Sequence, residues 1–344
     1  EKNQQSRVEI VLRDAAGAKK WLEVTTVPLF APQGKILGVA FTASDITARK
    51  KTEEELRHSS MHDPLTGLYN RIYFEEEMRR VDTERLYPVS IVVGDVDGLK
   101  FINDILGHGQ GDELLKAAAR ILQAPFRASD MVARIGGDEF AIILPQTMAG
   151  IVDGVMERLG QALEEYRSDN ENLPLYVSLG FATGEKPGEG VAKIFAQADV
   201  DMYKNKFTRR DKVKKNLVAY LRRLVREKDF RNERYEEHQR CLLLLFGQVL
   251  GLTYQELKDI LLLSKVYDIG KAGLDETILF KKEALDEDEW EEIQRHPEIG
   301  RRIASDSPEI APLADYIWQH HECWNGSGYP RGLKGENIHL YSRI

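Results

Sequence analysis

The spacing of apolar residues divides this 344-residue sequence into three stretches, and the division limits the folds that it can adopt. Residues 8–46 carry short β-rich runs separated by the turn segments AAGA and APQG. Residues 58–213 alternate helical and strand patterns, whereas beyond Lys214 apolar residues fall only at helical spacing. We therefore predict a multidomain α+β protein that begins with a short antiparallel sheet and ends in an all-α domain.

Residues 47–57 connect the first two stretches. Arg49, Lys50 and Lys51 each precede a glutamate by four residues here, a spacing that favours an exposed helix. Strands followed by Asp45-Ile46-Thr47 and a charged helix resemble the C-terminal part of a PAS sensory domain and its signalling helix. The predicted domains are the PAS remnant 1–46, the helical linker 47–57, a middle domain 58–213 and a last domain 214–344.

The order of predicted elements in the middle domain is βαββαβ, which indicates a ferredoxin-like sheet. These elements are a helix at 72–83, a strand at 89–93, a helix at 111–123, two strands flanking Gly136-Gly137, a helix at 151–166, a strand at 175–181 and a helix at 191–204. The helices predicted in the last domain span 216–227, 235–250, 254–267, 286–304 and 309–321.

Composition excludes several classes of function. A net charge of −8 with 30% charged residues indicates an acidic soluble protein, so we expect neither DNA nor RNA as a partner. Cys241 and Cys323 match no zinc or disulfide spacing, which favours a cytoplasmic location. The longest apolar run, 241–246, is too short to span a membrane. We expect a fragment cut at both ends, whose parent protein can still carry a membrane anchor.

Carboxylates follow two predicted strands of the middle domain. Asp95 comes after the apolar strand VSIVV, and Asp138 and Glu139 follow Gly136-Gly137, a dipeptide suited to the positive φ of a two-residue hairpin turn. Two aspartates on adjacent strands form an all-oxygen site of the kind that holds magnesium with nucleotide phosphates. The sequence therefore predicts phosphoryl-transfer chemistry at this edge.

The middle domain resembles the GGDEF family of diguanylate cyclases along almost its whole length. The matching segments, in the family's order and spacing, are HDPLTGLYNR (62–71), DVDGLKFINDILGHGQGDELL (95–115), RIGGDEFAIILP (134–145), SLGFA (178–182) and ADVDMYKNKFTRRDKV (198–213). The resemblance implies an enzyme that joins two GTP into cyclic di-GMP with Mg²⁺ or Mn²⁺. It also implies a homodimer, because each domain holds one GTP.

The resemblance also assigns roles to individual residues. Asp95, Asp138 and the carbonyl of Val96 would bind the metal, and Asp138 or Glu139 would assist deprotonation of the attacking 3′-hydroxyl. The residues matching guanine or substrate contacts are Asn103, His108 and Asp112, and the cations around the triphosphate are Lys100, Lys206 and Arg210. Arg127 and Asp130 match the RxxD inhibitory site that binds product, with Arg158 as its supporting arginine.

The last domain resembles the HD-GYP family, which hydrolyses cyclic di-GMP with a cluster of metals. The matching segments are LSKVYDIGKAGL (263–274), HPEIG (296–300) and QHHECWNGSGYPRGLKGENI (319–338). The resemblance places possible iron or manganese ligands at His238, Asp268, His296, His320 and His321. The family's His-Asp pair reads Tyr267-Asp268 here, and a phenol is a poor substitute for imidazole. We therefore expect a degenerate module with weak or absent phosphodiesterase activity.

Three hypotheses remain open on sequence alone. The first is a dimer-dependent, product-inhibited cyclase fused to a degenerate hydrolase. The second is a bifunctional or mainly hydrolytic enzyme in which the GGDEF domain binds GTP as a regulator, and the missing histidine at Tyr267 argues against it. The third is a non-catalytic cyclic di-GMP receptor, against which the intact Asp95, Asp138 and Glu139 argue.

Overall fold

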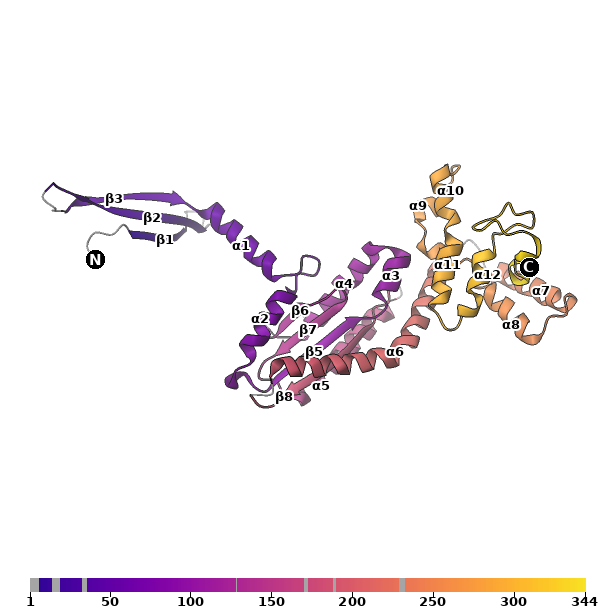
Figure 1. The fold of residues 1–344 in the computed structure, drawn as a ribbon, viewed down its shortest axis with the longest axis horizontal. Coiled ribbons are helices and arrows are strands. Elements are labelled where there is room, and N and C mark those ends of the chain that lie inside the picture. The colour runs from indigo at the N-terminus through magenta and orange to yellow at the C-terminus, as the bar shows by residue number, and fades with distance from the viewer. Residues whose placement is uncertain are drawn as a thin grey trace.

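A computed structural model describes residues 6–13, 19–32, 36–127, 129–169, 173–187, 190–228 and 233–344. Figure 1 shows an elongated chain in which a small sheet, a central α/β domain and a helical region follow one another. This order agrees with the predicted α+β organisation, with an antiparallel sheet first and helices last.

The first sheet is antiparallel, with strand order β1-β2-β3. Its strands are β1 (Ser6–Arg13), β2 (Lys19–Phe30) and β3 (Ile36–Asp45). The next helix, α1 (Thr47–Met61), is tied to this sheet at its start. The Trp21 N–H donates to Thr47 Oγ1 at 2.9 Å, and the Arg49 guanidinium donates to Glu9 at 2.9 Å. The first turn of the connecting helix is thus fixed to β1 and β2.

The central domain is built on a five-stranded sheet of order β4-β6-β7-β5-β8. The strands are β4 (Tyr69–Asn70), β5 (Val89–Val96), β6 (Met131–Arg134), β7 (Glu139–Leu144) and β8 (Val177–Gly184). The helices are α2 (Arg71–Val81), α3 (Leu99–Leu106), α4 (His108–Gln123) and α5 (Ala149–Ser168), with a 3₁₀ turn at Glu84–Leu86. The βαββαβ unit from β5 to β8 confirms the predicted ferredoxin-like arrangement, and the short β4 extends its edge.

Every residue of β5 is buried, because helices cover both faces of the sheet. Val92 packs into the cluster that contains Leu114 of α4 and Leu159 of α5. Ile91 packs on the opposite face, into the cluster that contains Phe74 of α2. A strand buried on both faces is largely apolar, so polar residues that form a site are expected at its end.

The last helix of the central domain, α6 (Val191–Lys228), continues without a break into the helical region. It replaces the two separate helices predicted at 191–204 and 216–227. Met202 packs in the central domain, whereas Leu221 and Val225 pack in the core of the helical region. The intervening residues include neither glycine nor proline, so the helix passes the predicted boundary at residue 214.

The helical region contains α7 (Glu233–Val249), α8 (Tyr254–Leu263), α9 (Glu276–Leu279), α10 (Glu287–Gln294), α11 (His296–Ser305), α12 (Ala314–Gln319) and α13 (Leu340–Arg343). Its 3₁₀ turns are η2 (Ile269–Gly273), η3 (Ala311–Leu313) and η4 (Gly335–Asn337). The helix predicted at 286–304 is two helices, because Pro297 lies in the first turn of α11 and has no N–H to continue the preceding helix. None of the helices described is long and apolar enough to cross a bilayer.

Candidate active site and metal-ligand group

Asp95 lies near the end of β5, the strand between β7 and β8. Its partners across the sheet are Glu139 on β7 and Ser178 on β8. The residue is only 5% exposed. Lys206 on α6 places its Nζ 2.6 Å from Asp95 Oδ1, so this buried carboxylate has an ion-pair partner.

The turn between β6 and β7 is held against the end of β5. The Val96 N–H donates to the Asp138 carbonyl oxygen at 2.9 Å, which places Asp138 beside the strand end. The Arg134 guanidinium donates to Asp63 at 3.1 Å and to the Gly137 carbonyl oxygen at 2.8 Å. Hydrogen bonds from two sides therefore fix this turn.

The predicted positive φ at Gly136-Gly137 is wrong. Neither glycine has a positive φ, although both lie in the part of the chain that the structure describes. Gly136 leaves room for a neighbouring side chain: a Cβ there would lie 2.5 Å from Glu139 Oε2, and the Glu139 side chain would have to shift. A Cβ at Gly137 would meet nothing within 4 Å. Space for the Glu139 side chain, rather than backbone conformation, explains the first glycine.

Negative charge accumulates at this edge. Burial raises the pKa of Asp95 and the neighbouring Asp138 raises it further, while the hydrogen bond from Lys206 opposes both effects. Burial and the charges of Asp138 and Asp95 also raise the pKa of Glu139. Asp97 is buried and accepts a hydrogen bond from Ser178 Oγ, and burial raises its pKa to about 6. Carboxylates thus outnumber the one cation paired with them, Lys206, and this excess of negative charge fits a cation surrounded by oxygen donors.

The residues predicted to contact guanine lie on α3 and at the start of α4. Asn103 packs against Gly111, where a Cβ would lie 1.9 Å from Asn103 Oδ1. That Oδ1 is buried and accepts no hydrogen bond among the described residues. His108 and Asp112 are exposed on α4, and Lys100 is exposed on α3. An unsatisfied buried acceptor is rare in proteins, which sets Asn103 apart from the exposed residues predicted beside it.

The predicted inhibitory residues form a local turn before β6. The Arg127 N–H donates to Asp130 Oδ2 at 2.9 Å, and the Asp130 N–H donates to the Arg127 carbonyl oxygen at 3.0 Å. The Arg127 side chain is exposed, as are Arg158 on α5 and Arg210 on α6. Residue 128, between the two motif residues, lies outside the described residues.

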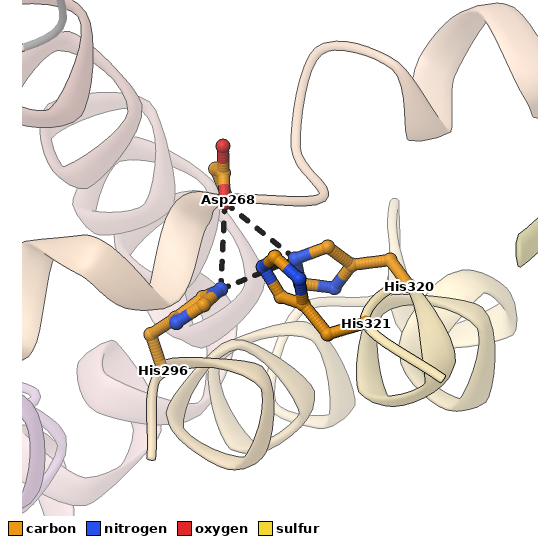
Figure 2. A group of neighbouring side chains, drawn as sticks. All are labelled: Asp268, His296, His320 and His321. Carbon is orange, nitrogen blue, oxygen red and sulfur yellow. Dashed lines mark hydrogen bonds and ion pairs between the residues drawn. The ribbon is translucent and has the colours of Figure 1, made fainter. Parts of the chain in front are cut away.

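Four possible metal ligands gather in the helical region: Asp268, His296, His320 and His321. Each offers a ligand atom within 4.8 Å of the others, and Figure 2 shows the rings directed at the Asp268 carboxylate. Within the described ranges this is the single group of three or more such residues at that spacing. The carboxylates around Asp95 are close enough to shift one another's pKa without being gathered this tightly.

Hydrogen bonds orient two of these imidazoles. His296 Nδ1 lies 2.7 Å from the Ile293 carbonyl oxygen, and His320 Nδ1 lies 2.6 Å from that of Ile317. A carbonyl only accepts, so each Nδ1 carries the proton and each neutral ring has its lone pair on Nε2. The two Nε2 atoms face each other at 3.1 Å, both 3.5 Å from Asp268 Oδ1. Lone pairs and a carboxylate that converge in this way fit a metal cation.

Burial lowers the pKa of His296 to about 4 and that of His321 to about 4, which keeps these rings neutral and able to bind metal. Burial by itself would raise the pKa of Asp268. The charge and the hydrogen bond of Lys271, whose Nζ lies 2.9 Å from Asp268 Oδ2, lower it well below the usual range. Asp268 is therefore an anion at neutral pH.

Two other predicted features of this region lie outside the group. Tyr267 presents its ring edge-on to His320, with ring centroids 5.4 Å apart. His238 is exposed on α7 and is not one of the four gathered residues. The structure thus assembles four of the five predicted ligands.

Comparison with known families finds three different matches in three successive parts of the chain. Residues 60–212 match the family described as diguanylate cyclase, GGDEF domain. The chain contains a GGDEF domain. Residues 219–344 match an HD domain, and residues 1–51 match a PAS fold.

Relatives of the GGDEF domain include named cyclases. The chain is 35% identical over 175 residues to the diguanylate cyclase DgcM of Escherichia coli K12, covering 49% of this chain and 42% of that protein. It is 30% identical over 205 residues to the probable diguanylate cyclase DgcE of the same strain, covering 58% of this chain and 18% of that protein. The chain therefore spans less than half the length of either relative.

A solved structure of the coiled coil and GGDEF domain of DgcB from Caulobacter crescentus, in complex with c-di-GMP, is 29% identical. The superposition covers 47% of this chain and 89% of the DgcB chain, with a TM-score of 0.43.

Sequence reasoning missed two features of the GGDEF domain. Asp97 is buried like Asp95, and its spacing of two residues from Asp95 could have indicated the shared location. The ion pair between Arg134 and Asp63 joins residues 71 positions apart, and no local pattern indicates it. The Arg134 pair holds the turn beside the strand end that carries the predicted catalytic residues, and Asp97 adds negative charge there.

Proposed function

We propose that the GGDEF domain is a diguanylate cyclase that condenses two GTP into cyclic di-GMP. The observation that carries this proposal is the edge where Asp95, Asp138 and Glu139 meet with an excess of negative charge. Lys206 partly offsets that charge. Each 3′-oxygen attacks the α-phosphorus of the other GTP, and pyrophosphate leaves.

The side chains of Asp95 and Asp138 and the carbonyl of Val96 would hold Mg²⁺ or Mn²⁺. When bound, such a cation supplies charge that activates the hydroxyl and steadies the leaving oxygen. Asp138 or Glu139 accepts the proton of the attacking hydroxyl, and the raised pKa of Glu139 suits a proton acceptor. Lys206, now on Asp95, is free to contact the triphosphate once a cation takes over that carboxylate.

Substrate selection is proposed to come from α3 and α4. Asn103 Oδ1, a buried acceptor without a partner among the described residues, would accept from the guanine N1 and N2 donors, assisted by Asp112. Adenine has no N1–H and no 2-amino group, so this arrangement favours GTP over ATP. Lys100, His108 and Arg210 are the further substrate contacts.

The proposal includes two controls on the cyclase, which are homodimer formation and inhibition by the product. Each domain holds one GTP, so the product forms only in a homodimer, whose alignment α1 would set. Arg127, Asp130 and Arg158 would bind cyclic di-GMP and inhibit the enzyme. The exposed side chain of Arg127, held on a hydrogen-bonded turn, supports a role in binding a phosphate.

For the HD domain we propose metal binding with weak or absent phosphodiesterase activity. The convergence of Asp268, His296, His320 and His321 supports the metal, which would be iron or manganese. Tyr267 and the exposed His238 leave fewer ligands for a second ion. Hydrolysis of cyclic di-GMP to the linear dinucleotide or GMP would contradict the degeneracy and favour a bifunctional enzyme.

The test is incubation of the purified chain with GTP and Mg²⁺, with chromatographic separation of the nucleotides. Wild type should form cyclic di-GMP, Asp138→Ala should abolish it, and the exposed Asp153→Ala on α5 should not change it. Absence of product from a dimeric wild-type chain would refute the cyclase. Arg127→Ala should remove the plateau caused by accumulating product, and an unchanged time course would contradict product inhibition.

A further inference from the structure

The HD domain contacts the GGDEF domain at the C-terminal end of α3. Arg302 on α11 donates from Nη2 to the Asp104 carbonyl oxygen at 3.0 Å. The last carbonyls of a helix have no partner within the helix, so a guanidinium from another domain caps the end of α3. Figure 1 shows α3 at the edge of the central domain that faces α11.

Apolar packing accompanies this cap. Ile105 of α3 is 6% exposed and belongs to the core cluster of the HD domain, together with Ile269 of η2 and Ile299 of α11. Gly273, the last residue of η2, approaches so closely that a Cβ would lie 2.6 Å from the Ile105 carbonyl oxygen. The end of α3 thus completes the core of the neighbouring domain.

Ion pairs contribute less to this contact. Lys214 Nζ lies 3.2 Å from Asp306 Oδ1, and Lys215 Nζ lies 3.7 Å from Glu309 Oε2. Most of these side chains are well exposed, and exposed pairs contribute little because solvent and salt screen them. The packing of the buried Ile105 therefore dominates, and the exposed hydrogen bond from Arg302 adds to it.

Asn103 directly precedes the capped residue Asp104, and its Oδ1 is the buried acceptor without a partner among the described residues. We propose that η2 and α11 hold α3 in the position in which Asn103 meets guanine, with Arg302 and Gly273 as positioning residues. This inference rests on the proposed GTP site. The HD domain then contributes to the GTP site through docking, whether or not it hydrolyses anything.

The experiment measures binding and local stability in the full chain. Arg302→Gln should weaken the Kd for a non-hydrolysable GTP analogue about fivefold, the effect of one typical hydrogen bond, and leave the cyclisation rate at saturating GTP within about twofold. Amide hydrogen exchange at residues 102–106 should accelerate without nucleotide. Arg302→Lys should restore part of the affinity, because an ammonium can still donate to the carbonyl.

The matched control is Arg295→Gln, since Arg295 precedes α11 and pairs with Glu292 of its own domain at 3.1 Å. It should leave the Kd and the exchange rates unchanged. Gly273→Ala is a second test that forces the Ile105 contact apart without removing a charge, and it should reproduce the Arg302→Gln effects.

Wild-type Kd and exchange in both Arg302→Gln and Gly273→Ala would overturn the inference. A wild-type chain that binds no GTP analogue would refute the proposed function and the positioning role with it. Exchange at residues 102–106 would still show whether the HD domain stabilises α3.

Discussion

Replacing Lys206 with methionine tests the ion pair at the end of β5. The Asp95 side chain is 7% exposed and that of Lys206 is 37% exposed. Removing one partner of a fully buried pair costs about 3–5 kcal/mol of unfolding free energy. Because solvent reaches Lys206, screening reduces the expected loss to about 1–2 kcal/mol at neutral pH.

The loss should depend on pH in a defined direction. Burial already raises the pKa of Asp95, and removing the Lys206 hydrogen bond takes away an effect that lowers it. A carboxyl whose folded-state pKa exceeds its unfolded value stabilises fully below the unfolded pKa, and this stability is lost as pH rises through the folded pKa. Lys206→Met should therefore be destabilised more at pH 8 than at pH 4.5.

The assay is denaturant unfolding followed by circular dichroism at both pH values, with EDTA present so that no divalent cation replaces the ammonium. Lys204→Met is the matched control, because Lys204 is exposed two residues earlier on α6. Equal stability of the two variants at pH 8 would refute the buried pair. A loss of unfolding free energy in Lys206→Met that grows toward low pH would contradict the raised pKa of Asp95.

Three further predictions concern other groups. Gly136→Ala should reduce cyclic di-GMP formation at least about tenfold, because the new Cβ meets Glu139. Gly137→Ala should retain most of the activity, because a Cβ there meets nothing. Equal rates for the two variants would contradict the steric explanation. Relative to wild type, Asp97→Asn should become more stable by about 1–2 kcal/mol as the pH rises from 4 to 7, because wild type loses stability when Asp97, whose pKa is raised to about 6, ionises. A difference in melting temperature that stays constant across that range would contradict this prediction. Metal analysis of purified protein should find at least about tenfold weaker metal retention in His320→Gln, and unchanged retention would rule out this ligand group.

The sequence determined much of the architecture. Continuous apolar residues in VSIVV and the segments flanking Gly136-Gly137 predicted strands, and β5, β6 and β7 confirm them. Motif spacing also identified Asp268, His296, His320 and His321, which the fold gathers. These features depend on local periodicity or on contiguous motifs, both of which are readable along the chain.

Other features were settled only by tertiary contacts. The extension of α6 through residue 214 depends on a core for Leu221 and Val225 that no local pattern reveals. Gly136 is explained by the volume of Glu139 rather than by its own backbone conformation. Side-chain space and helix capping across domains depend on residues far apart in the sequence, as the contact of Arg302 with Asp104 illustrates.

The sequence by itself therefore determined which chemical groups this protein carries and which strands and helices bear them. Only the tertiary structure decided which carboxylates are buried, that Lys206 neutralises Asp95, and that the HD domain completes the end of α3. The physical reason is that burial and charge interactions depend on distances through space, which periodicity along a chain does not specify.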